Sequence, residues 1–264
     1  MASFTAKDVQ ALRKATGAGM MDAKRALEEN EGDATAAAKW LREKGIAKAA
    51  ARSDRENTEG VVAVAVIDGV GAIVELKCET DFVAKSDRFI AMAQELADLV
   101  AREGEEALAS RATEIEDLKI TLKENIEVGR VVRMEAAEGD VLAYYLHMQE
   151  GRGVNAVLVE LAGGDEDKAR EVAMHAAFTR PRYLSRDEVP ADVVAAERET
   201  LLNITKNEGK PEQAWDKIVE GRLTGWFKEH TLLEQKWVKD EKQTIDKMLG
   251  DARIVRFAQV EIGS

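Results

Sequence analysis

The histidines and the single cysteine are the side chains here that most readily perform covalent or metal chemistry, and they are few. His147, His175 and His230 lack the paired spacing of a helical metal site, and Cys78 has no evident base beside it. Glycine-rich loops that hold nucleotide phosphates are absent, as is the Gly-x-Ser-x-Gly motif of hydrolases. The sequence therefore predicts structural roles for these residues and a protein without catalytic chemistry, metal or cofactor of its own.

A pair of adjacent methionines marks the first unusual segment, residues 16–24. Met20 and Met21 cannot both face the core of a small helical module, because neighbouring residues point about 100° apart on a helix. Either one is buried and the other is incidentally exposed, or both form an adaptable apolar docking surface of the kind that methionine suits. The spacing leaves both alternatives open.

A second unusual segment, residues 79–85, lies between a predicted strand and a predicted helix, where functional loops concentrate. In one interpretation Phe82 folds back as a hydrophobic staple while Thr80 or Asp81 caps the helix. In the other, Phe82 projects from the loop to contact a partner. The pattern of residue types does not decide between them.

Composition limits the function classes. The 264 residues are 45% apolar and 33% charged, with a net charge of −12. Residues 1–55 carry eleven basic and eight acidic side chains, so a mildly basic N-terminal part precedes an acidic body. The acidic balance argues against sequence-independent nucleic-acid binding by the whole chain. A lone cysteine and the lack of a ~20-residue apolar run predict a cytoplasmic protein that binds no membrane.

Hydrophobic periodicity predicts an α+β fold. Three short helices are expected within residues 4–46, the last ending at Gly45. A linker is expected over 47–57, and its first residues can be helical. Strands are expected at 61–67 and 72–78, helices at 86–102 and 114–124, and a strand at 128–136. The strand-strand-helix order recurs at 141–147, 155–161 and from Asp165, which predicts two similar subdomains, each an antiparallel sheet with a helix.

The last part of the chain is predicted to form a projecting helical hairpin. Two long amphipathic stretches, beginning after Pro190 and at about Trp215, flank a turn at 207–211. Trp237 and Val238 are expected to lead into a further helix that runs through Leu249, and a final strand is expected at 254–262. The predicted domains are a three-helix bundle with linker (1–55), a first core subdomain (56–139), a second subdomain in two parts (140–186 and 229–264) and a coiled-coil arm (187–228).

Residues 16–24 and 79–85 each resemble a signature of the bacterial elongation factor Ts family. The similarity continues through residues 173–175, 220–222 and 256–257, and so covers nearly the whole chain in order. The resemblance implies a guanine nucleotide exchange factor that binds the GTPase elongation factor Tu, GDP-bound and nucleotide-free. It also implies an N-terminal three-helix module, two similar α+β subdomains and a coiled-coil arm.

The resemblance further implies which residues contact the GTPase. Arg13, Met20 and Met21 match the part of the N-terminal module that contacts a helix of the nucleotide domain. The loop that disturbs the magnesium site is matched by Thr80, Asp81, Phe82 and Val83, with Phe82 as a wedge and Asp81 as its polar companion. His147 lies near a family position implicated in the same contact.

Two departures from the family pattern are visible, and two rival functions stay open. The chain ends at Ser264, directly after the last predicted strand, where family members often carry a helical extension, and residues 227–237 diverge. The resemblance fits a monomer or a homodimer. The rivals are an enzyme, which the absence of a catalytic motif disfavours, and a non-catalytic scaffold or adaptor with a helical arm.

Overall fold

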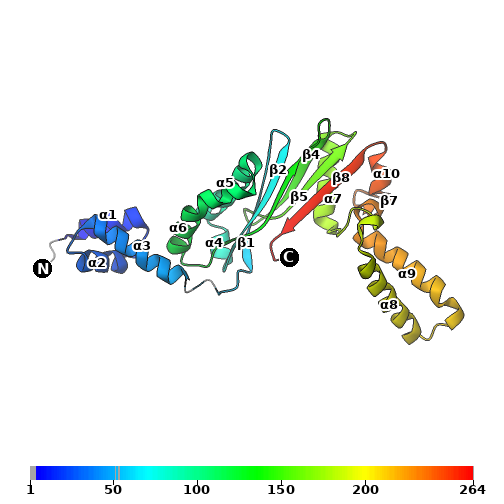
Figure 1. Ribbon diagram of the computed structural model, residues 1–264, viewed down its shortest axis with the longest axis horizontal. Helices are drawn as coiled ribbons and strands as arrows, with labels where there is room; N and C mark the ends of the chain where they lie inside the picture. Colours follow the sequence, from blue (N-terminus) through cyan, green and yellow to red (C-terminus); the bar gives the residue numbers. More distant parts are fainter. Residues whose placement is uncertain (1–3, 51, 53, 264) are drawn as a thin grey trace.

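The computed structural model describes residues 4–50, 52 and 54–263, without the side chains of 46–48 and 50. The molecule is elongated, with N-terminal helices at one end, two sheets in the centre and a helix pair projecting from the other end (Figure 1). Helices and small antiparallel sheets occur together, so the predicted α+β class is confirmed.

Three helices form the N-terminal end: α1 (Ala6–Thr16), α2 (Met20–Glu29) and α3 (Ala34–Ala50). They pack around a small core of Val9, Leu12, Ala23, Ala26, Leu27 and Ala37. Thr5 caps α1, and its backbone N–H donates to the Asp8 carboxylate in return (2.7 Å), as their spacing predicts.

The predicted end of the third helix at Gly45 is wrong, because α3 continues to Ala50. The glycine serves a close approach between helices. A Cβ atom at this position would lie 2.6 Å from the Ile120 side chain of α6 (Ala112–Leu122). Positions 51 and 53 of the predicted linker lie outside the described residues.

Two three-stranded antiparallel sheets form the centre. The first has the order β1-β2-β3 (Glu59–Ile67, Val70–Cys78, Glu127–Glu135), and the second has the order β4-β5-β8 (Val141–Gln149, Arg152–Ala162, Arg253–Glu261). Helix α5 (Asp87–Glu103) packs on the first sheet and α7 (Glu166–Thr179) on the second. Both sheets thus follow the strand-strand-helix order that the sequence predicts.

The apolar runs of β1 and β2 reflect burial on both faces. Val61 and Ala63 point toward α5, whereas Val62 and Val64 point toward the second sheet. Between the sheets, residues from both form one buried cluster, which includes Ile73, Leu142, Ala156, Leu158 and Val260. The two sheets therefore share a core.

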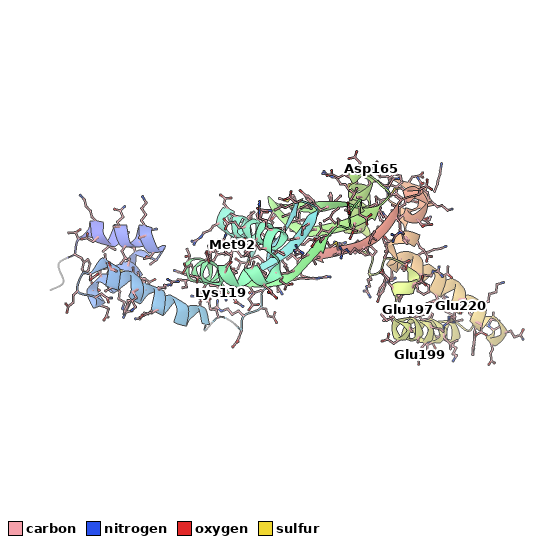
Figure 2. The ribbon with its side chains drawn as sticks, turned by 45° about the horizontal axis from the view of Figure 1, so that its top comes forward. Met92, Lys119, Asp165, Glu197, Glu199 and Glu220 are labelled. Atoms are coloured by element: carbon pink, nitrogen blue, oxygen red, sulfur yellow. The ribbon has the colours of Figure 1, made fainter. Side chains whose placement is uncertain are left out.

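The projecting pair consists of α8 (Ala191–Asn207) and α9 (Trp215–His230), which pack against each other. Near the end of the pair closest to the core, Leu223 and Phe227 are buried together with Val189. Further along, the polar side chains of Glu199 and Glu220 lie on the surface (Figure 2). The remaining short 3-10 helices are η1 (Glu105–Arg111), η2 (Arg186–Glu188), η3 (Glu212–Ala214) and η4 (Leu232–Glu234).

The segment after the helix pair corrects a second prediction. Residues 237–244 form no helix; they belong to a small hairpin of β6 (Lys236–Trp237) and β7 (Asp240–Thr244), and only α10 (Ile245–Leu249) is helical. Thr244 caps α10 by accepting a hydrogen bond from the Lys247 N–H, which fixes where that helix begins. Among the described helices, none is both long and apolar enough for a membrane span.

Candidate functional site

The loop after β2 contains a single helical turn, α4 (Asp81–Ala84), that presents one aromatic ring to solvent. Val83 and Ala84 are buried under the turn, whereas the Phe82 side chain is 83% exposed. The staple interpretation of Phe82 is therefore wrong. Thr80 is the N-cap, since its hydroxyl oxygen accepts a hydrogen bond from the Val83 N–H at 3.4 Å.

Cys78 supports this loop from below and is unsuited to chemistry. Its thiol is buried and donates a hydrogen bond to the Thr80 carbonyl oxygen (3.3 Å). Burial, assisted by the negative charge of Glu124, raises the pKa of Cys78 to about 12. At neutral pH the thiol therefore stays protonated and acts as a small packing group.

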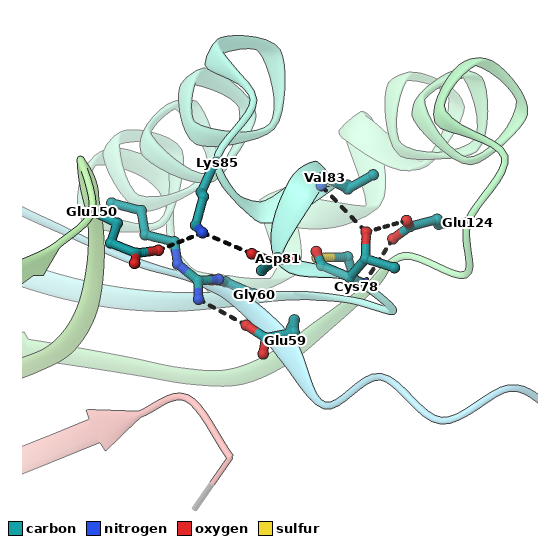
Figure 3. Close-up of polar contacts among 10 residues, drawn as sticks. Glu59, Gly60, Cys78, Asp81, Val83, Lys85, Glu124 and Glu150 are labelled. Carbon is teal, nitrogen blue, oxygen red and sulfur yellow. Dashed lines mark hydrogen bonds and ion pairs between the residues drawn. The ribbon is translucent and has the colours of Figure 1, made fainter.

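Asp81 and Lys85 connect this loop to the turn between β4 and β5 of the second sheet (Figure 3). The Lys85 Nζ lies 2.7 Å from an Asp81 carboxylate oxygen and also pairs with Glu150 in the turn between β4 and β5. The hydrogen bond from Lys85 lowers the pKa of Asp81, and the bond to Asp81, followed by that to Glu150, raises the pKa of Lys85. Both groups are thus charged at neutral pH, and Asp81 already has an internal partner.

Met20 and Met21 lie on the first turn of α2, and both side chains are exposed. Met20 is 48% and Met21 72% exposed, while Ala23, Ala26 and Leu27 bury the other face of the helix. The alternative in which one methionine is buried is therefore wrong. Arg13 is exposed on neighbouring α1.

The three histidines have local partners. His147 is exposed in β4, where its ring nitrogen lies 3.4 Å from the Tyr145 hydroxyl. His175 is fully buried beside the Gln235 side chain (3.0 Å), and burial lowers its pKa. His230 stacks on Trp226. Within the described residues, no group of three or more His, Cys, Asp or Glu side chains is placed to hold a metal ion.

A cleft of about 1040 Å³ is lined by residues of the N-terminal helices and of the region around α6. Residues 16–19, just before the methionine pair, line part of it. Eight basic and two acidic side chains line it as well: Lys14, Arg25, Lys39, Arg42, Lys44, Arg52, Arg88, Lys123, Asp22 and Asp117. Sequence reasoning missed this cleft, because its basic residues are spread from α1 to the end of α6, and only the net charge of residues 1–55 hinted at it.

The structure thus gathers Thr80, Asp81, Phe82 and Val83 on one turn, with Val83 facing the core. Arg13, Met20 and Met21 belong to the helices at the N-terminal end, a separate part of the elongated molecule (Figure 1). His147 lies three residues before Glu150, which pairs with Lys85. The candidate residues therefore form several exposed patches and no single enclosed pocket, an arrangement that suits contact with a large partner.

Comparison with known proteins agrees with the resemblance to elongation factor Ts. The family model described as "Elongation factor TS" matches residues 79–264. The protein named Elongation factor Ts in Clavibacter michiganensis is 44% identical over the full length of both chains. Proteins of the same name in Deinococcus deserti and Pediococcus pentosaceus are 42% and 43% identical, over 98% and 100% of this chain and 99% and 93% of theirs. This chain belongs to the elongation factor Ts family.

Proposed function

We propose that the protein promotes GDP release from elongation factor Tu and holds the nucleotide-free GTPase until GTP binds. The observation that carries this proposal is the 83% exposed Phe82 ring on a turn whose neighbours are buried or hydrogen-bonded. A fully exposed aromatic ring offers a partner a large apolar area to cover. No chemistry on the nucleotide is needed.

Exchange follows from binding linkage. A factor that binds the nucleotide-free GTPase better than the loaded form weakens nucleotide and Mg²⁺ binding by the same ratio. In our proposal Phe82 inserts between helices of the GTPase, and Asp81, Thr80 and Val83 complete the loop that disturbs its magnesium site. Covering a phenylalanine ring of roughly 150–250 Å² is worth about 4–6 kcal/mol before ordering costs. Such a gain is ample for an acceleration of several decades.

The other patches would supply affinity. We assign residues 1–55 as a three-helix docking bundle, in which Arg13, Met20 and Met21 contact the nucleotide domain. The two core subdomains are assigned to residues 56–139 and to residues 140–186 with 229–264. His147, in the second of these, is assigned to the same contact as Phe82. Residues 187–228 are assigned as a coiled-coil arm, supported by the packing of α8 on α9.

The basic cleft supports docking against an acidic surface. Its lining carries a formal excess of positive charge within a chain whose net charge is −12. Opposite charges around an interface accelerate encounter more than they tighten the final complex. We therefore assign the cleft to the approach of an acidic segment of the GTPase.

A fluorescent nucleotide assay tests the proposed function. Elongation factor Tu is loaded with fluorescent GDP, excess unlabelled GDP is added, and the decay is followed with substoichiometric amounts of this protein. Release should accelerate at far less than one equivalent. Stoichiometric binding without faster release would instead indicate a scaffold, and no effect on binding or release would refute the proposal.

Met21→Asp should weaken docking without slowing the exchange step itself. A carboxylate placed in an apolar contact makes the binding free energy less favourable by about 1–2 kcal/mol, so the half-saturating concentration should rise about tenfold. The maximal rate should change less than twofold, because the turn carrying Phe82 is untouched. Val238→Asp is the matched control, since Val238 is another exposed apolar residue (42%) but lies in the β6–β7 hairpin. A fall in maximal rate with unchanged half-saturation would contradict this assignment.

A further inference from the structure

Glu124, from the connection between α6 and β3, holds the Phe82 turn from a distant part of the chain. One of its carboxylate oxygens accepts hydrogen bonds from the backbone N–H groups of Glu79 (3.0 Å) and Thr80 (3.1 Å). The other oxygen accepts one from the Thr80 hydroxyl at 2.5 Å (Figure 3). Hydrogen bonds to an ionised acceptor are about twice as strong as those between neutral groups.

The contact is reciprocal. The Glu79 carboxylate accepts a hydrogen bond from the backbone N–H of Asn125 (2.7 Å) and pairs with Arg55 (3.1 Å). The Asn125 side chain donates to the Arg55 carbonyl oxygen at 3.0 Å. Arg55, Glu79, Thr80, Glu124 and Asn125 form what we term the loop clasp, which joins the end of the linker, the Phe82 turn and the entry to β3.

The clasp also determines which hydrogen bonds the Thr80 hydroxyl can donate and accept. A hydroxyl group has one hydrogen to donate, and Thr80 gives it to Glu124. Its oxygen lone pairs are then directed to the Val83 N–H, which is the cap of α4. A four-residue helix has no intrinsic stability, because nucleation alone is unfavourable. The position of Phe82 therefore depends on contacts from outside its own segment.

We infer that Glu124 is a positioning residue for nucleotide exchange, acting through the Thr80 cap to hold Phe82 in the orientation that enters the GTPase. This inference rests on the proposed function. Pre-ordering a contact group removes the entropic cost of ordering it on binding. Because the methionine pair lies on another part of the molecule, loss of the clasp acts on the exchange step more than on docking.

Glu124→Gln tests the inference, because glutamine keeps the shape but loses the charge and one acceptor oxygen. The maximal rate of GDP release should fall about tenfold, with half-saturation within twofold of wild type. Glu106→Gln is the matched control; it removes the same charge from an exposed residue of η1 whose side chain makes no hydrogen bond or ion pair within the described chain. Thermal unfolding of each variant is measured in parallel. If Glu124→Gln lowers the melting temperature by more than a few degrees, Thr80→Val replaces it, with Thr80→Ser expected to restore the rate.

A double variant separates positioning from a general loss of structure. If Glu124 acts through Phe82, then Phe82→Ala with Glu124→Gln should release GDP within twofold of Phe82→Ala alone. A further tenfold loss would show independent action and overturn the inference, as would wild-type rates in Glu124→Gln or in its Thr80→Val replacement. If the unmodified protein does not accelerate GDP release, the proposed function fails instead. The two failures are thus distinguishable.

Discussion

Phe82→Ala is expected to remove at least about 97% of the stimulation of GDP release. Interface anchors of this type contribute about 2–4 kcal/mol, and each 1.4 kcal/mol is a factor of ten, so a loss of roughly 30-fold or more follows. The ring is 83% exposed in the free protein, so its removal takes away almost no internal packing. The measurement is the maximal release rate of fluorescent GDP at saturating protein.

Phe89→Ala is the matched control for this result. The same substitution seven residues later, in α5, removes a ring that is fully buried in the core between α5 and the first sheet. It should cost about 3–5 kcal/mol of stability. Phe82→Ala should instead melt within about 2 °C of wild type, since surface changes are usually worth less than 0.5 kcal/mol. Wild-type exchange by a well-folded Phe82→Ala protein would refute the wedge.

Gly153→Ala should be the most damaging single-methyl addition in the core. A Cβ at this position of β5 would lie 2.2 Å from the Val62 carbonyl oxygen of β1 and 2.8 Å from the Leu146 side chain. The carbonyl belongs to a buried strand and cannot move without disturbing the shared core. A loss of about 2–3 kcal/mol is expected, equivalent to roughly 5–10 °C in melting temperature by calorimetry.

Gly221→Ala, in α9, is the opposite case. Its added methyl group would meet no atom within 4 Å, so only helix propensity changes. Alanine is favoured over glycine in helices by up to about 1 kcal/mol, and the variant should be slightly more stable. If Gly153→Ala and Gly221→Ala changed the melting temperature by the same amount, the close approach of the two sheets at Gly153 could not be the reason that Gly153→Ala destabilises the protein.

The regular elements were predictable from the sequence where one pattern dominates. The apolar runs of β1 and β2 and the caps at Thr5 and Asp165 place their elements within a few residues. Gly45 was misread because glycine ends a helix and also permits close packing, and only the neighbouring α6 decides between these uses. The β6–β7 hairpin is largely charged and short, and so lacks the alternation that reveals strands.

The site was predictable in part for a related reason. Residues 79–85 stand out locally, but whether Phe82 packs inward or projects depends on how the turn packs on β1 and β2, where Val83 and Ala84 are buried. Glu124 was not predicted to support Thr80, because 44 residues separate the two and a single glutamate gives no signal of a distant backbone partner. Long-range polar contacts of this kind depend on the assembled fold.

The inert cysteine has a practical consequence for fluorescence experiments. Burial raises the pKa of the Cys78 thiol to about 12, so the thiol stays protonated at neutral pH, and it has no exposed surface. A cysteine introduced at an exposed position such as Ser110 should therefore take up a maleimide dye alone, without prior removal of the native residue. Paired dyes on this protein and on the GTPase could then report association and dissociation in single complexes.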